Sequence, residues 1–73
     1  MTWSYRIVHT LIDGEHSFGI HEAYGQPPHS ITADPVPAYG ESVAELRDVY
    51  AMMGEAFDRP VLESADFDPK VKP

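Results

Sequence analysis

The sequence predicts one small α+β domain, in which three or four antiparallel strands are followed by one packed helix in the order β-β-β-α. Two alternating segments on either side of an Asp-Gly pair predict a hairpin. An apolar residue at every third or fourth position after residue 42 predicts an amphipathic helix. The chain has 73 residues, which is enough for only one hydrophobic core. We therefore expect a single domain over 1–62 and a flexible acidic and polar tail over 63–73.

The N-terminal part of the chain is predicted to form a β-hairpin. Apolar and aromatic side chains alternate with polar ones over 3–11 and again over 17–24, a pattern typical of strands with one buried face. Asp13-Gly14 lies between the two segments, and both residue types tolerate the positive φ angles of tight turns. The face expected to be buried consists of Trp3, Tyr5, Ile7, His9 and Leu11 from the first segment and Phe18, Ile20 and Tyr24 from the second.

Prolines shape the segment between the hairpin and the helix. Pro27 and Pro28 predict a turn, after which residues 30–32 are predicted to form a short third strand. The segment 34–37 contains two further prolines, and it is excluded from a central strand because proline has no amide N–H for the ladder. Residues 60–62 are expected to form either a short edge strand, which would be the fourth, or an apolar contact.

One helix is predicted over residues 43–58. Ser42 is a favourable N-cap, and Glu45 completes a capping box in which each side chain accepts a hydrogen bond from an amide of the first turn. Pro60 ends the helix, because proline interrupts helical hydrogen bonding. The apolar stripe that should pack on the sheet consists of Val43, Leu46, Tyr50, Met53 and Phe57.

The segment Gly40-Glu41-Ser42-Val43-Ala44-Glu45-Leu46, which follows a hairpin and a third strand, resembles the helix start in the small domain of HicB-type antitoxins. That resemblance implies a helix packed on a three-stranded sheet. The chain departs from that family at Asp34-Pro35-Val36-Pro37, where the family has a glycine-rich segment, and no room for a DNA-binding domain is left after the helix. More broadly, Trp3-x-Tyr5-Arg6-Ile7-Val8, Ile20-His21-Glu22-Ala23-Tyr24 and Asp34-Pro35-Val36 look like a group of small uncharacterised bacterial proteins, a resemblance that brings no function with it.

The composition excludes several classes of function. Five basic residues against twelve acidic ones give a net charge of −7, and direct nucleic-acid binding relies on the cations that this chain lacks. Without cysteine there is no disulfide and no thiolate metal site. No apolar run approaches the roughly 20 residues that cross a bilayer, and the N-terminus lacks the features of a secretory signal. We therefore expect a cytoplasmic protein that does not bind membranes.

No combination of residues indicates catalysis. The sequence has neither a Gly-x-Ser-x-Gly turn nor a glycine-rich phosphate loop, and a sheet with one helix is expected to offer little concavity for a pocket. Glu22 is expected either to be hydrated at the rim of the sheet or to meet Arg6 across the hairpin. The candidate metal ligands are His9, His16, His21 and His29. Because alternation places His9 and His21 on opposite faces, we predict that the histidines do not form a metal site. We also expect no cofactor and no enzymatic activity.

Association with another protein is the function that the sequence favours. One helix covers one face of a sheet and leaves the other face and at least one edge free. A chain this small, with no disulfide or metal, gains stability by pairing, so we expect a homodimer formed through the N-terminal hairpin or its edge. The candidate interface residues are Trp3, Tyr5, Val8, Tyr39 and Met52. Two alternatives stay open: an acidic, phage-type mimic of nucleic acid that inhibits a nucleic-acid enzyme, and a small metal-binding domain built on the histidines.

Overall fold

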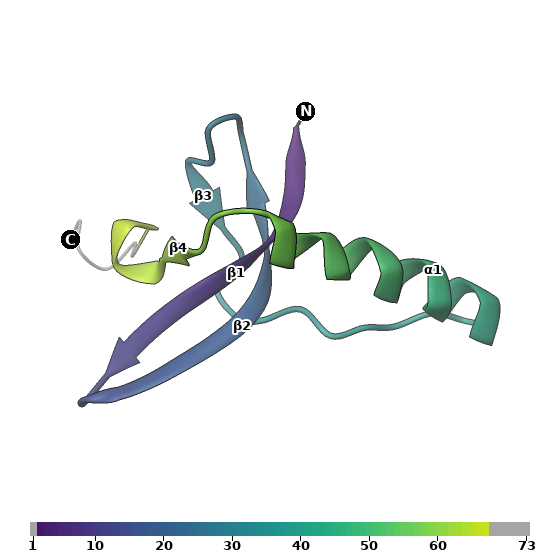
Figure 1. Ribbon diagram of the computed structural model, residues 1–73, viewed down its shortest axis with the longest axis horizontal. Helices are drawn as coiled ribbons and strands as arrows, with labels where there is room; N and C mark the ends of the chain where they lie inside the picture. Colours follow the sequence, from purple (N-terminus) through teal and green to yellow (C-terminus); the bar gives the residue numbers. More distant parts are fainter. Residues whose placement is uncertain (1, 68–73) are drawn as a thin grey trace.

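The computed structural model describes residues 2–67 and confirms the α+β class, with a four-stranded sheet and one α-helix (Figure 1). The elements in chain order are the strands β1 (Trp3–Ile12), β2 (Glu15–Tyr24) and β3 (Ser30–Ile31), the helix α1 (Val43–Gly54), the 3-10 turn η1 (Glu55–Asp58), the strand β4 (Leu62–Glu63) and the 3-10 turn η2 (Ser64–Phe67). The strand order is β3-β2-β1-β4. The hairpin predicted from alternation therefore forms the centre of the sheet.

The β1–β2 hairpin has the register that a two-residue turn imposes. Ile12 pairs with Glu15 across Asp13 and Gly14, whose φ angles are 53° and 82°. Positive φ at both central residues is the mark of a type I′ turn, whose twist matches that of the strands it joins. Both strands consequently extend closer to the turn than predicted, to Ile12 and from Glu15.

The two outer strands are short, and β4 differs from the prediction in its direction. β3 pairs antiparallel with the end of β2. β4 pairs parallel with the middle of β1, where Leu62 lies opposite Val8 and Glu63 lies opposite His9. The sheet is therefore mixed rather than wholly antiparallel. Glu63 and the turn η2 fall in the segment predicted as a tail but have regular structure, whereas 68–73 lie outside the described residues.

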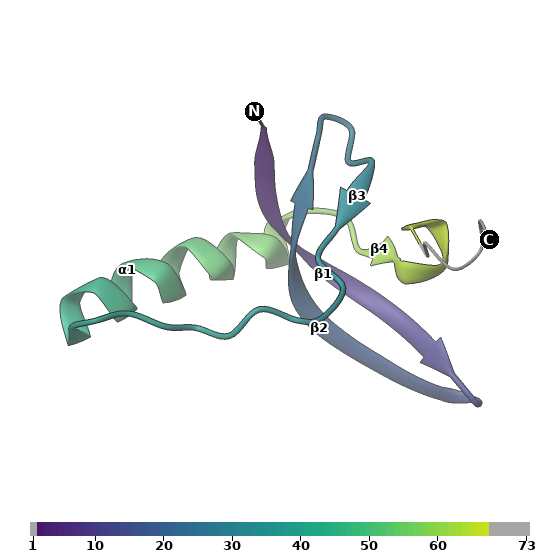
Figure 2. The ribbon, with the colours of Figure 1, turned by 180° about the vertical axis from the view of Figure 1, so that it is seen from behind.

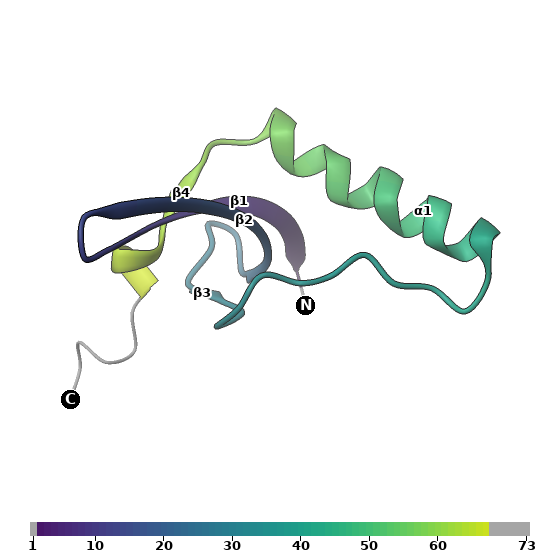
Figure 3. The same cartoon turned by 90° about the horizontal axis from the view of Figure 1, so that it is seen from below.

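The most buried side of the hairpin is not the side that alternation predicted. Arg6, Val8, His21 and Ala23 are the buried residues of the two strands. They share one face, which we call the covered face, because Arg6 pairs with His21 and alternate residues point the same way. The two faces of the hairpin are covered by different segments. In Figure 3, β3 and η2 lie on one side of the hairpin and α1 lies on the other.

Short segments rather than the helix cover this face. The ring of Pro35 packs against Gly19, since a Cβ added there would lie 2.9 Å from Pro35 Cγ. His21 Nδ1 lies 2.8 Å from the carbonyl oxygen of Thr32. These contacts come from the loop that follows β3. The proline-containing segment 34–37, which was excluded from a central strand, therefore packs on the covered face. The opposite side, with Ile7 and Ile20 half-buried, is called the open face below.

Helix α1 begins as predicted but stands away from the sheet. Ser42 Oγ accepts a hydrogen bond from the amide of Glu45 at 3.1 Å, and Glu45 Oε1 accepts one from the amide of Glu41 at 2.6 Å. Within the predicted stripe only Met53 is buried. The prediction that the whole stripe packs on the sheet is therefore wrong, because the chain meets β1 mainly through η1, where Ala56 is buried.

The molecule is extended for its length. Its Cα radius of gyration is 13.2 Å, whereas a compact domain of this size has about 11 Å. Its accessible surface is 5429 Å², whereas about 4500 Å² is usual for a monomer of this mass. Figures 1 and 2 show the reason: α1 and the tip of the hairpin project in opposite directions from the centre of the sheet. The helix thus contributes to the surface more than to the core.

The Ser42 cap is expected to contribute about 1 kcal/mol to stability. Changing Ser42 to alanine removes the acceptor for the Glu45 amide, so the midpoint of urea denaturation should fall and the helical circular dichroism signal should weaken. The matched control is Ser17→Ala, at an exposed position of β2. Equal midpoints for the two variants would contradict a stabilising cap at Ser42.

Candidate functional site

Helix α1 and the turn that continues it present large apolar side chains to solvent. Tyr50 is 72 % exposed, Phe57 is 74 % exposed and Leu46 is 38 % exposed. Leu46 and Tyr50, together with the exposed Val43, form what we call the helix stripe, whose spacing of three and four residues aligns the side chains along one face of α1. Contiguous apolar surface of this kind is uncommon on monomers and often marks a contact with another protein. The stripe is the first candidate site.

A groove of about 500 Å³ lies on the open face of the sheet, beside η1. Its apolar walls are formed by Ile7, Phe18, Ile20, Ala56, Phe57 and Val61. The groove is open because α1 leaves the sheet instead of crossing it, so the helix does not cover its own sheet face. The sequence predicted little concavity, and this groove corrects that expectation.

The predicted interface residues occupy different parts of the molecule. Trp3 and Tyr5 lie on β1 with their rings in edge-on contact, 5.0 Å between centroids. Tyr39 is exposed in the segment before α1, and Met52 is exposed on α1 outside the helix stripe. Val8 is fully buried and has no surface to offer a partner. Its place on the covered face, where β4 pairs with β1, removes it from the candidate set.

The helix stripe was missed as a surface because residue spacing does not identify the partner of an apolar face. The same three-and-four spacing serves a helix on its own sheet and a helix on another chain. The hairpin edges, by contrast, are less free than predicted, since β3 pairs with β2 and β4 with β1. The helix therefore offers a large apolar surface away from the hairpin edges, in addition to the exposed Leu11, Ile12 and Phe18 of the hairpin.

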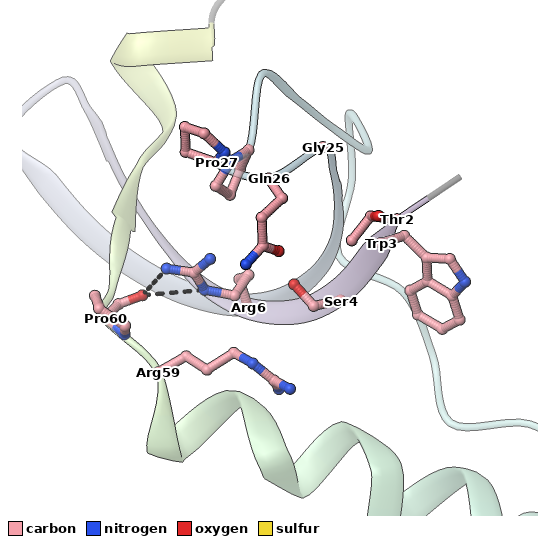
Figure 4. A pocket seen from close by; sticks show the side chains of 10 residues that line it. Thr2, Trp3, Ser4, Arg6, Gly25, Gln26, Pro27, Arg59 and Pro60 are labelled. Atoms are coloured by element: carbon pink, nitrogen blue, oxygen red, sulfur yellow. Dashed lines mark hydrogen bonds between the residues drawn. The ribbon is translucent and has the colours of Figure 1, made fainter.

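A second hollow, of about 510 Å³, lies between the start of β1, the turn at 25–28 and residues 59–60 (Figure 4). Arg6 reaches it from β1, although the residue is only 9 % exposed. Its Nε and one terminal nitrogen donate hydrogen bonds to the Pro60 carbonyl oxygen, at 3.3 and 2.8 Å. Arg59 lines the same hollow. Burial first, and then the positive charge of Arg59, lowers the pKa of Arg6.

The alternative that Arg6 meets Glu22 is wrong. Arg6 pairs with His21 in the hairpin register, so Glu22, one residue further along β2, points to the opposite face. The Glu22 carboxylate instead accepts a hydrogen bond from the hydroxyl of Tyr24. That bond raises the pKa of Tyr24.

Two histidines and a carboxylate form a hydrogen-bonded row on the open face. His9 Nδ1 lies 2.7 Å from Glu63 Oε1, and His9 Nε2 lies 2.8 Å from His16 Nδ1. The His9 ring also stacks on Phe18. His21 lies on the face opposite His9, as predicted from alternation, but this is the covered face, and His21 is buried there. In the part of the chain that the structure describes, no group of three or more histidine, aspartate or glutamate side chains is arranged to hold a metal ion.

No protein-family model, curated protein or solved structure matches this chain. The resemblance to HicB-type antitoxins therefore stays a prediction. Among residues 2–67, no helix has the length and apolar character needed to cross a membrane. The fold and surface define a small α+β protein whose apolar helix is left uncovered.

Proposed function

We propose that this chain is a non-catalytic protein-interaction module that forms a homodimer, with the helix stripe of each copy lying in the groove of the other. The observation that carries this proposal is that one chain holds both an uncovered apolar helix and an uncovered apolar groove. A two-fold arrangement satisfies both at once, because each copy gives its helix and receives that of its partner. The partner is therefore a second copy of the chain.

The amount of free surface supports a dimer. The accessible surface of 5429 Å² exceeds the usual value for a monomer of this mass by about 900 Å². One partner of a standard protein interface loses about 800 Å². Docking the helix stripe in a groove would bury part of this exposed surface.

The charge of the helix also permits pairing. The whole chain carries −7, which opposes association through repulsion. Within α1, however, the charged residues are Glu45, Arg47 and Asp48, which give a net charge of 1 − 2 = −1. Most of the repulsive charge thus lies outside the helix, and the hydrophobic gain at the stripe is opposed by little local repulsion.

Sedimentation equilibrium over a range of micromolar concentrations tests the proposed dimer. We expect a mass approaching twice the 8.1 kDa of the chain and a melting temperature that rises with protein concentration, since mass action favours the associated folded state. A single species of 8.1 kDa, with a melting temperature that does not depend on concentration, would contradict the proposal.

A further inference from the structure

The hollow next to Arg6 contains a buried guanidinium that the described residues only partly satisfy. Arginine has five N–H donors, and two of its nitrogens share a single acceptor, the Pro60 carbonyl oxygen. Among residues 2–67 no fully buried side-chain nitrogen lacks a hydrogen-bond partner. The other N–H groups of Arg6 are therefore open to the hollow rather than enclosed by protein.

The positive charge of Arg6 is not balanced by a carboxylate within the described part of the chain. No carboxylate there lies within ion-pair distance of Arg6, and Arg59 has only the long contact with Glu55, at 3.5 Å. Two of the five basic residues of an acidic chain thus line one hollow. A buried charge without a counter-charge is costly, and an anion bound beside Arg6 would offset that cost.

The rest of the lining suits an anion with several oxygens. Thr2, Ser4 and Gln26 line the hollow and bring hydroxyl and amide donors. In Figure 4 the side-chain amide of Gln26 points toward Arg6, and the side chain of Ser4 lies next to that amide. The volume of about 510 Å³ is within the range of small-molecule sites. Guanidinium groups bind the paired oxygens of carboxylates and phosphates through parallel charge-assisted hydrogen bonds.

We propose that this hollow, which we call the oxyanion pocket, binds a small ligand through a carboxylate or phosphate group held by Arg6 and attracted by the positive charge of Arg59. Arg6 provides a donor fork whose position is set by its bonds to Pro60, and Arg59 adds the second positive charge. Carboxylate and phosphate share this chemistry, so the experiment below separates them. Arg6 lines this pocket and not the groove of the proposed dimer, whereas Arg59 lines both, so the association state is measured alongside binding.

The test titrates the whole chain with sodium phosphate and with sodium acetate, each against sodium chloride at the same ionic strength. The readouts are the ¹⁵N chemical shift of Arg6 Nε and the melting temperature. We expect one of the two oxyanions to shift the Arg6 signal saturably and to raise the melting temperature. Tighter binding of phosphate identifies a phosphate ligand, and tighter binding of acetate identifies a carboxylate.

A matched pair of variants tests the assignment to this pocket. Arg59→Gln removes one positive charge from the pocket and should weaken the affinity for the oxyanion roughly tenfold, as the loss of a nearby opposite charge predicts. Arg47→Gln removes the same charge from an exposed position of α1 and should leave affinity unchanged. Sedimentation of both variants shows whether any effect arises from altered association.

Two results would overturn the oxyanion pocket. One is an equal, non-saturable response to phosphate, acetate and chloride. The other is equal affinity of the Arg59→Gln and Arg47→Gln variants for the oxyanion. Arg6→Lys gives a further comparison, because it keeps the charge and removes the fork; if that variant fails to fold, the Arg59 comparison still decides.

Discussion

Replacing Tyr50 by glutamate is expected to convert the proposed homodimer to a monomer while each chain keeps its fold. Tyr50 is 72 % exposed in the single chain, so the change removes no core contact, and glutamate is a good helix former. In the dimer the new carboxylate would lose its hydration in a groove whose lining is apolar except for Arg59, which already contacts Glu55, and burial of a charge in such a groove is unfavourable. The dissociation constant should rise at least about 100-fold, as measured by sedimentation equilibrium.

The matched control places the same charge on another face of the helix. Ala51 is exposed and follows Tyr50 directly, so its side chain points about 100° further round the helix axis. Ala51→Glu should therefore leave the dimer largely intact. Equal dissociation of the two variants would show that added negative charge, rather than loss of the helix stripe, separates the copies. A Tyr50→Glu chain that remains dimeric would place the interface elsewhere.

Replacing Val8 by alanine is expected to lower the free energy of unfolding by about 2–3 kcal/mol. Val8 is the largest fully buried side chain of the described residues, and truncation would leave a cavity on the covered face. A chain of this length has a total stability of roughly 4–11 kcal/mol, so the loss would be a large share of it. Urea denaturation at several protein concentrations is the measurement, and the loss should be the same at each, because the contacts of Val8 lie within one chain.

Ile12→Ala is the control for the Val8 experiment. Ile12 lies on the same strand and the same face as Val8, four residues further along, but near the exposed tip of the hairpin. Its truncation should cost well under the Val8 value, within about 1 kcal/mol. If both variants lose the same stability, the core does not lie at the covered face.

The features that the sequence predicted correctly depend on residues close together in the chain. The type I′ turn requires positive φ at two neighbouring positions, and Asp13-Gly14 supplies both. The helix start depends on hydrogen bonds between residues three and four positions apart, from Ser42 and Glu45. The third strand was predicted because prolines mark its boundaries, whereas the fourth was only a candidate at 60–62 and shares Leu62 alone with β4. Interactions of this kind, between residues close together in the chain, can be predicted without knowledge of the tertiary fold.

The errors concern burial, and each arises from a contact between distant segments. Alternation identifies two faces of a strand, but it does not say which is covered. The covered face was decided by Pro35 on Gly19 and by the return of the chain to β1 at β4. The helix stripe was assigned to the sheet for the same reason. The periodicity of α1 does not encode the direction in which the helix projects from η1 and the sheet.

The sequence by itself determined the α+β class, the hairpin with its turn, the helix start and the opposite facing of His9 and His21, because all of these follow from backbone geometry over a few residues. Only the tertiary structure decided that Val8 is core, that the helix stripe is exposed, and that Arg6 lies beside Pro60, 54 residues away. Such contacts depend on how whole segments pack, and packing is set by the balance of burial and chain entropy over the entire molecule. The candidate sites proposed above belong to this second group.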